Sequence, residues 1–116
     1  MKKTQKNRCK LPPLSARKFT SKILRYSSPR VAQKMAHKYL GKHANLYPAT
    51  NPHKKYRVCN PKTGKWTQFG QIGYEDFTRH KDRNRRKNYL TRTSKMRGDW
   101  KDNKYSANNL SRNVLW

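Results

Sequence analysis

The chain has 116 residues, enough for one domain, and carries 30 Lys and Arg residues against five Asp and Glu, giving a formal net charge of +25. Such a charge repels itself in a compact monomer, so we expect a negatively charged partner. No apolar run approaches the roughly 18 residues of a membrane-spanning helix, which excludes an integral membrane protein of that kind. Nucleic acid, an anionic membrane face and an acidic protein surface are the candidate partners.

Two cysteines, Cys9 and Cys59, are too few for a disulfide framework and too far apart for a zinc site. We therefore expect two reduced thiols. The basic N-terminal residues are not followed by the apolar segment of a signal peptide, which indicates a protein that stays inside the cell or is packaged inside a particle.

The N-terminal segment, residues 1–28, is predicted to be a basic extended arm. All five acidic residues fall after residue 74, so residues 1–74 hold 18 basic residues and no acidic one. The two prolines at 12–13 stiffen an extended conformation, and the weak helical period over residues 14–26 is interrupted by Ser and Thr. This part of the chain is expected to face outward.

Residues 29–41 are predicted to form an amphipathic basic helix. Ser28 can cap it, Pro29 is tolerated in its first turn, and Gly41 is a natural stop. Residues 42–54 include two prolines and are predicted to be a linker. The cationic side of the helix is expected to bind the partner and consists of Arg30, Lys34 and Lys38.

Beyond the linker, the pattern changes to strands and turns. The runs 56–59 and 66–69 flank a segment rich in turn-forming residues, which indicates a β-hairpin. Asp82 can cap a helix that extends to about Met96, and Ser106 can cap a last helix.

Residues 55–116 hold nine of the 13 aromatic residues and are predicted to be the folded core, a hairpin with helices. The predicted fold class is therefore small α+β: a β-hairpin plus short helices with an extended basic N-terminal arm. The aromatic residues expected to fill the core or to anchor partners are Tyr56, Trp66, Phe69, Phe77, Tyr89, Trp100 and Trp116.

The densest basic cluster lies around the helix that Asp82 is predicted to cap. Arginine binds phosphate or carboxylate with two parallel hydrogen bonds, so this cluster suits nucleic acid or an acidic protein surface. A solvated helix face, partly paired with neighbouring acids, is the alternative. The predicted binding residues are Arg79, Lys81, Arg83, Arg85, Arg86, Lys87 and Arg92.

Two short segments, 55–57 and 65–66, alternate basic and aromatic residues. This pattern is also found where single-stranded nucleic acid stacks on aromatic rings. A small hairpin needs the same rings for its own core, and we favour that interpretation.

A metal or nuclease site is suggested only by the cluster of His80 and Asp82 near Glu75 and Asp76. Hydrolysis needs several such groups converging on a pocket, and here the surrounding cations offset the acids. We expect Asp82 to be a helix cap and the others to be ion-pair partners. The sequence therefore predicts no enzyme, no metal, no cofactor and no small-molecule substrate.

Several segments together resemble a small uncharacterised family of basic proteins from nucleocytoplasmic large DNA viruses, the giant viruses of algae and amoebae. The resemblance covers about residues 55–116 and has no enzymatic role to transfer. The segments that carry it are Tyr74–Asp82, Arg85–Arg86, Tyr89–Leu90, Arg92, Asn60–Trp66, Gly98–Trp100, Tyr105–Ser106, Asn108–Leu110 and Leu115–Trp116.

The resemblance implies a virion, in which an icosahedral capsid covers an inner membrane that encloses DNA. We expect a non-catalytic virion structural protein, made in the infected host cell. Its first expected role is that of a minor capsid (cement) protein whose basic arm contacts neighbouring capsid proteins or the anionic inner membrane face. The alternative is a sequence-nonspecific DNA-binding protein that condenses the viral genome.

Overall fold

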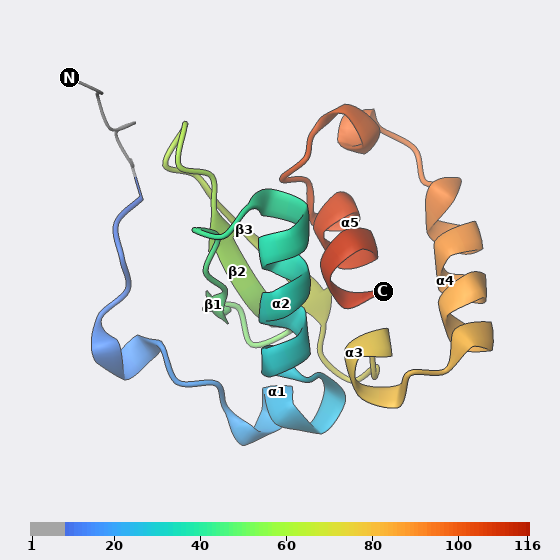
Figure 1. Ribbon diagram of the computed structural model, residues 1–116, viewed down its shortest axis with the longest axis horizontal. Helices are drawn as coiled ribbons and strands as arrows, with labels where there is room; N and C mark the ends of the chain where they lie inside the picture. The colour runs from blue at the N-terminus through green and yellow to red at the C-terminus, as the bar shows by residue number, and fades with distance from the viewer. Residues whose placement is uncertain (1–8) are drawn as a thin grey trace.

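A three-stranded antiparallel sheet in the order β1-β2-β3 lies at the centre of the fold (Figure 1). The structure, a computed structural model, describes residues 9–116. The strands are β1 (Tyr47–Pro48), β2 (Lys54–Cys59) and β3 (Trp66–Gln71). Strands β2 and β3 are the predicted hairpin, which is confirmed, and they pair with Tyr56 opposite Phe69.

The prediction of a linker over residues 42–54 is wrong, because this segment supplies strand β1 and a buried core residue, Leu46. The segment is fixed by one side chain of the preceding helix. Gln33 donates from Nε2 to the carbonyl oxygen of Ala44 at 2.7 Å and accepts at Oε1 from the N–H of Leu46 at 2.8 Å. Two hydrogen bonds to one glutamine therefore order a stretch that has no hydrophobic period.

Two helices precede the sheet, α1 (Ser21–Tyr26) and α2 (Pro29–Leu40). The prediction for α2 is confirmed, including its Ser28 cap and its end at Gly41. The prediction of an extended arm is wrong over α1, whose first turn is capped by Thr20. Thr20 and Ser28 each accept a hydrogen bond from a main-chain N–H in the first turn of their helix, so polar residues that interrupt the hydrophobic period start these helices.

The first part of the described arm contains a short 3₁₀ turn, η1 (Leu14–Ala16). Residues 1–8 of the predicted arm lie outside the described residues. Cys9 is joined to Cys59 by a disulfide, with their Cα atoms 6.0 Å apart. The prediction of two reduced thiols is therefore wrong, and the N-terminal segment is tied covalently to the end of β2.

Short helical elements form the C-terminal part of the chain. Asp76, Asp82 and Ser106 each cap the helix that follows. The caps at Asp82 and Ser106 confirm the predicted helix starts. The elements are α3 (Phe77–His80), α4 (Arg83–Ser94), η2 (Asp99–Asp102), α5 (Ala107–Leu110) and the π-helical turn η3 (Ser111–Leu115).

The hydrophobic core combines both halves of the chain: of the ten buried apolar residues among residues 9–116, six lie in the predicted core segment 55–116 and four lie before it. Helix α2 lies across the sheet and beside α5, whereas α4 stands at the edge of the molecule (Figure 1). Among residues 9–116, no helix is long and apolar enough to cross a bilayer. The buried apolar residues are Ile23, Ala32, Ala36, Leu46, Tyr56, Val58, Phe69, Leu110, Val114 and Leu115.

Strand β3 packs closely against the C-terminal turn at Gly70. This residue has φ of +80°, and a Cβ atom there would lie 2.8 Å from Cδ1 of Leu115 and 3.2 Å from Cβ of Lys55. Glycine is therefore required by the backbone conformation and by the space.

Candidate functional site

Helix α4 carries half of the ten predicted binding cations, and its surface is polar on every side. Thr93 is its one buried residue. A helix without an apolar stripe is held by polar contacts rather than by burial. The cations of α4 are all exposed, and they are Arg83, Arg85, Arg86, Lys87 and Arg92.

The middle of α4 is held by hydrogen bonds from the C-terminal elements. Arg112 donates from Nη1 to the carbonyl oxygen of Leu90 at 2.6 Å and to the hydroxyl of Thr93 at 2.5 Å. Asn108 donates from Nδ2 to the carbonyl oxygen of Thr93 at 3.2 Å. These bonds fix the orientation of α4 while leaving most of its surface in water.

Arg86 differs from the other cations of α4 because it is used within the fold. Its Nε donates to the main-chain oxygen of Trp116 at 2.5 Å, and its guanidinium lies 5.5 Å from the ring centre of Phe77. Arg86 was predicted to bind the partner, and it is an exposed residue whose Nε is already bonded within the fold.

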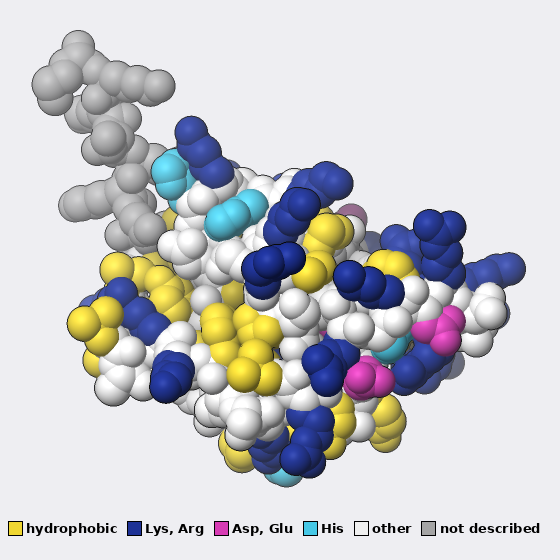
Figure 2. Space-filling view, turned by 60° about the horizontal axis from the view of Figure 1, so that its bottom comes forward, with side chains coloured by type: hydrophobic (Ala, Val, Ile, Leu, Met, Phe, Trp, Pro, Cys, Tyr) yellow, Lys and Arg dark blue, Asp and Glu magenta, His cyan; other side chains and the backbone are white. Residues whose placement is uncertain are grey.

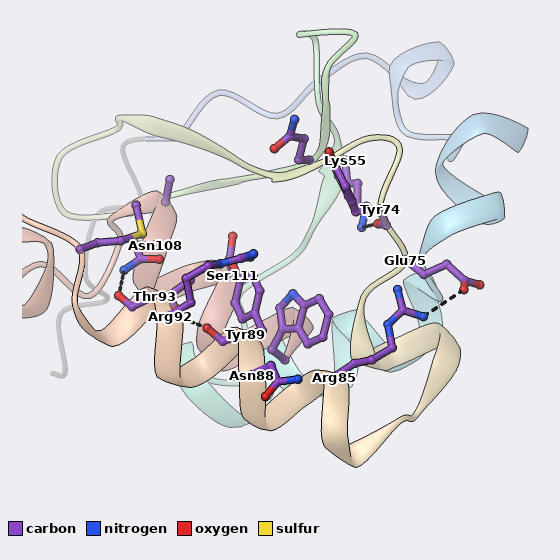
Figure 3. Close-up of a pocket in the computed structure, with 14 residues that line it drawn as sticks. Lys55, Tyr74, Glu75, Arg85, Asn88, Tyr89, Arg92, Thr93, Asn108 and Ser111 are labelled. Carbon is purple, nitrogen blue, oxygen red and sulfur yellow. Dashed lines mark hydrogen bonds and ion pairs between the residues drawn. The ribbon is translucent and has the colours of Figure 1, made fainter.

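The inner side of α4 lines a cleft of about 810 Å³, here called the α4 cleft, which lies between α4 and the ends of β2, β3 and α5 (Figure 3). Arg85 and Arg92 are seven residues apart, so they lie on one face of the helix, separated by about 10 Å along its axis. Asn88 and Tyr89 lie between them on the same face. The outer side of α4 carries Arg83 and Lys87.

Aromatic rings form one wall of the α4 cleft. Tyr89 and Trp116 stack with ring centres 4.2 Å apart and an interplanar angle of 8°. The guanidinium of Arg92 lies 5.5 Å from the ring centre of Tyr89. Burial raises the pKa of the Tyr89 hydroxyl, so it stays protonated. The rim carries Tyr74, whose side chain is 65% exposed.

One acidic residue, Glu75, belongs to the lining of the α4 cleft. Its carboxylate lies 3.7 Å from Nη1 of Arg85 and 3.5 Å from Nε of Arg79 (Figure 3 shows the pair with Arg85). Ion pairs this exposed contribute little to stability, so a phosphate can compete for either arginine. The predicted pairing of Glu75 with the basic cluster is confirmed.

Beneath the cleft lies a buried polar network. Nζ of Lys55 lies 3.1 Å from Oδ2 of Asp76 and donates to the carbonyl oxygen of Tyr74 at 2.6 Å. Both charged side chains are almost completely buried. Burial lowers the pKa of the Lys55 ammonium, and the Asp76 carboxylate opposes that shift. Asp76 was predicted to pair with a cation, but the sequence did not indicate that the partner would be buried.

The other oxygen of Asp76 extends this network to the start of α2. It accepts hydrogen bonds from the N–H and the hydroxyl of Thr78. The Thr78 hydroxyl in turn accepts from the N–H of Ser28 at 2.9 Å and lies 3.1 Å from the hydroxyl of Ser27. Tyr56 donates to Ser27 at 2.7 Å. The network therefore joins α3, β2 and the loop before α2.

The predicted cationic side of α2 is exposed and separate from the α4 cleft. Arg30, Lys34 and Lys38 recur every four residues on the face opposite the buried Ala32 and Ala36. Lys and Arg side chains are spread over the face shown in Figure 2, whereas acidic side chains appear at few points. The protein thus presents cations in several directions.

Most of the predicted aromatic anchors are used inside the molecule. Tyr56 and Phe69 are fully buried. Trp66 lies under the guanidinium of Arg57, 5.0 Å from its ring centre. Phe77, Tyr89, Trp100 and Trp116 are half-buried. The exposed large hydrophobic residues that the sequence reasoning missed are Leu11, Leu14, Leu24, Tyr74 and Met96.

The histidine and carboxylate cluster does not form a metal site. In the part of the chain from residue 9 to residue 116, no three His, Cys, Asp or Glu side chains converge to hold a metal ion. Asp82 caps α4, as predicted, through Oδ1. His80 accepts at Nδ1 from the N–H of Asp82 at 2.8 Å, and burial together with Arg85 lowers its pKa.

Comparison with known protein families finds a match over part of the chain. Residues 44–93 are similar to DUF5754, a family of unknown function. No curated protein and no solved structure matches the chain. The matched segment extends from the region before β1 into the last turn of α4, so it includes Tyr74, Arg85 and Arg92 and leaves out α2.

Proposed function

We propose that the protein is a non-catalytic structural protein of a virion that binds nucleic acid through its phosphates, without sequence preference. The observation that carries this proposal is the surface of α4. Its outer cations, Arg83 and Lys87, are exposed, and in the described part of the chain neither side chain has a hydrogen bond or an ion pair. Such side chains are available to a polyanion.

The charge balance supports the same function. The 30 Lys and Arg residues face only five Asp and Glu residues, which leaves a net charge of +25, and one of the five carboxylates, that of Asp76, is paired inside the core. Each phosphate that a lysine or arginine neutralises releases a counterion, which favours binding at low salt. Cations on α2 and on α4 face different directions and suit contact with more than one nucleic-acid segment, as genome condensation requires.

The experiment is a titration of labelled duplex DNA with the purified protein at several salt concentrations, using two unrelated sequences. We expect equal affinity for both sequences and a linear fall of log K with log salt, with a slope of about −0.9 per phosphate contact. Heparin should compete. Absence of binding at low salt, or an affinity that does not change with salt, would overturn the proposal.

A second candidate function is the expected cement role on the inner side of the capsid. The observation that favours it is the exposure of Leu11 and Leu14, at 61% and 79%, on the segment that the disulfide holds. Hydrophobic side chains gather on the left of the face shown in Figure 2. Exposed leucines in a fixed segment suit burial in a neighbouring capsid protein. The anionic inner membrane face would gain from the same leucines and the adjacent cations.

These two functions separate when particles that contain the protein are disrupted in graded salt. Departure with the DNA core, abolished by nuclease, supports genome binding. Retention on DNA-free shells at high salt supports the cement role, because hydrophobic contacts resist salt better than phosphate contacts do.

A further inference from the structure

We infer that the α4 cleft binds a segment of single-stranded nucleic acid, with a base stacked on Tyr74 and phosphates bound by Arg85 and Arg92. This inference rests on the proposed function and adds a preference for unpaired strands. A volume of about 810 Å³ is in the size range of sites that enclose a small ligand. It suits an unpaired base with its sugar and phosphate and is too small for a duplex.

Tyr74 has the properties of a stacking platform. Its side chain is 65% exposed, and within residues 9–116 its ring has no aromatic or cation contact. Its backbone is nevertheless fixed, because the buried Lys55 donates to its carbonyl oxygen at 2.6 Å. An exposed ring on a fixed backbone loses little entropy when a base stacks on it.

The two arginines flank the position where the backbone of the strand would lie. Arg85 is near Tyr74, on the side of Glu75, and Arg92 is two helical turns further along the same face of α4 (Figure 3). Arginine can grip a phosphate with two hydrogen bonds. The amides of Asn88 and Asn108 line the cleft between and beside them and can hydrogen-bond base edges.

An acidic peptide is the competing occupant. It would use the same arginines through its carboxylates but would gain little from the ring of Tyr74. The combination of an exposed ring, amides and arginines therefore favours nucleic acid, in which bases and phosphates alternate.

The test compares a single-stranded oligonucleotide of mixed sequence with a duplex of the same length, measured by fluorescence anisotropy at one salt concentration. Tyr74→Ser should weaken single-strand binding at least fivefold and leave duplex binding unchanged. Tyr74→Phe keeps the ring and should keep the affinity. Tyr74 is exposed, so both variants should fold, which circular dichroism checks.

Two double variants that remove the same charge separate the effect of the α4 cleft on binding from the effect of net charge. Arg85→Gln with Arg92→Gln and Arg83→Gln with Lys87→Gln each remove two positive charges from α4. Both should weaken duplex binding by a similar factor. Only the first should abolish the preference for the single strand.

The results separate failure of single-strand binding in the α4 cleft from failure of nucleic-acid binding as a whole. Suppose that duplex binding depends on salt, and that Tyr74→Ser either weakens single-strand and duplex binding equally or weakens neither. This result overturns the inferred role of the α4 cleft and leaves the proposed function standing. No binding to either strand overturns both. A poly-glutamate peptide that binds through Arg85 and Arg92 independently of Tyr74 overturns the inference in favour of an acidic peptide.

Discussion

A cationic side chain is buried in the region around Lys55, whereas the cationic side chains are exposed on helix α4. Lys55 is buried, paired with Asp76 and bonded to a main-chain oxygen, so its charge is satisfied inside the molecule. Arg83 and Lys87 on α4 extend into water. A buried charge is costly without a partner, whereas a solvated charge is not. Removing the partner of Lys55 should therefore lower the free energy of unfolding strongly, whereas removing a charge on α4 should change it little.

The net charge of a chain is therefore a poor guide to the role of any one cation. Arg86 and Arg112 belong to the cationic sequence around α4 and its neighbours, yet both hydrogen-bond main-chain oxygens within the fold. Substitutions in the buried network should change stability, whereas substitutions on the outer side of α4 should change binding alone.

The comparison is tested most severely at Asp76. Asp76→Asn removes the carboxylate and leaves the Lys55 ammonium buried beside an amide, so we expect a loss of about 3–5 kcal/mol in the free energy of unfolding. Urea denaturation measures it. Glu75→Gln is the matched control, since the Glu75 side chain is 38% exposed, and it should cost less than about 1 kcal/mol. Equal losses for the two variants would remove the distinction between the regions.

The disulfide gives the next largest effect on the body of the fold. Cys9 and Cys59 are 50 residues apart in sequence, and in the chain-entropy treatment such a link contributes about 4 kcal/mol by restricting the unfolded chain. We expect a reductant to lower the melting temperature of the wild-type protein and to leave that of Cys9→Ser with Cys59→Ser unchanged. A melting temperature that does not respond to reduction would contradict this.

Gly70 tests how closely β3 packs against the C-terminal turn. Gly70→Ala combines a positive φ with a clash against Leu115, and we expect it to cost about 1–3 kcal/mol. Gly41→Ala is a control of the same chemistry, because Gly41 also has a positive φ but has no atom within 4 Å of the added Cβ. The difference between the two in denaturation experiments measures the close packing of β3 against the C-terminal turn.

Removing the outer cations of α4 should hardly change stability but should change the salt dependence of binding. Arg83→Gln with Lys87→Gln should change the free energy of unfolding by less than about 0.5 kcal/mol. If both residues contact phosphates, the salt slope of duplex binding should become shallower by about 2. An unchanged slope would show that the outer side of α4 does not face the nucleic acid.

His80, at the junction of α3 and α4, should make the stability of the fold depend on pH. Its pKa is lowered from 6.5 in the folded state by burial and by Arg85, so the unfolded chain binds a proton more readily. The contribution to stability is therefore present above pH 6.5 and is lost as the pH falls through the folded pKa. We expect His80→Gln to reduce the dependence of the urea midpoint on pH below 6.5. Nuclear magnetic resonance titration of the imidazole checks the pKa directly.

Local signals in the sequence predicted the elements that depend on them. Ser28, Asp82 and Ser106 indicated helix starts because a capping side chain acts within three residues, and the turn between β2 and β3 was equally local. The exposed cations of α2 and α4 also followed from composition and spacing. Their binding role stays a prediction.

Features that depend on distant contacts were missed. Lys55 and Asp76 are 21 residues apart, and nothing in the sequence around Lys55 shows that this lysine, rather than Lys54 or Arg57 beside it, is the buried cation. Helix α1 has six residues, which is too short for a hydrophobic period that would predict the burial of Ile23. The α4 cleft arises from the separation of a polar helix from the body, and that separation is set by Arg112 and Asn108, far along the chain.

The bond between Cys9 and Cys59 also makes a closed covalent ring from the chain that includes α1, α2 and β1. A protease that cuts once inside this ring produces no separate fragment, because the two new ends stay joined through the cystine. Nicked protein would therefore migrate as one species on a denaturing gel and separate into two pieces only after reduction. The cationic face of α2 thus stays attached to the sheet even after the chain beside it has been cleaved.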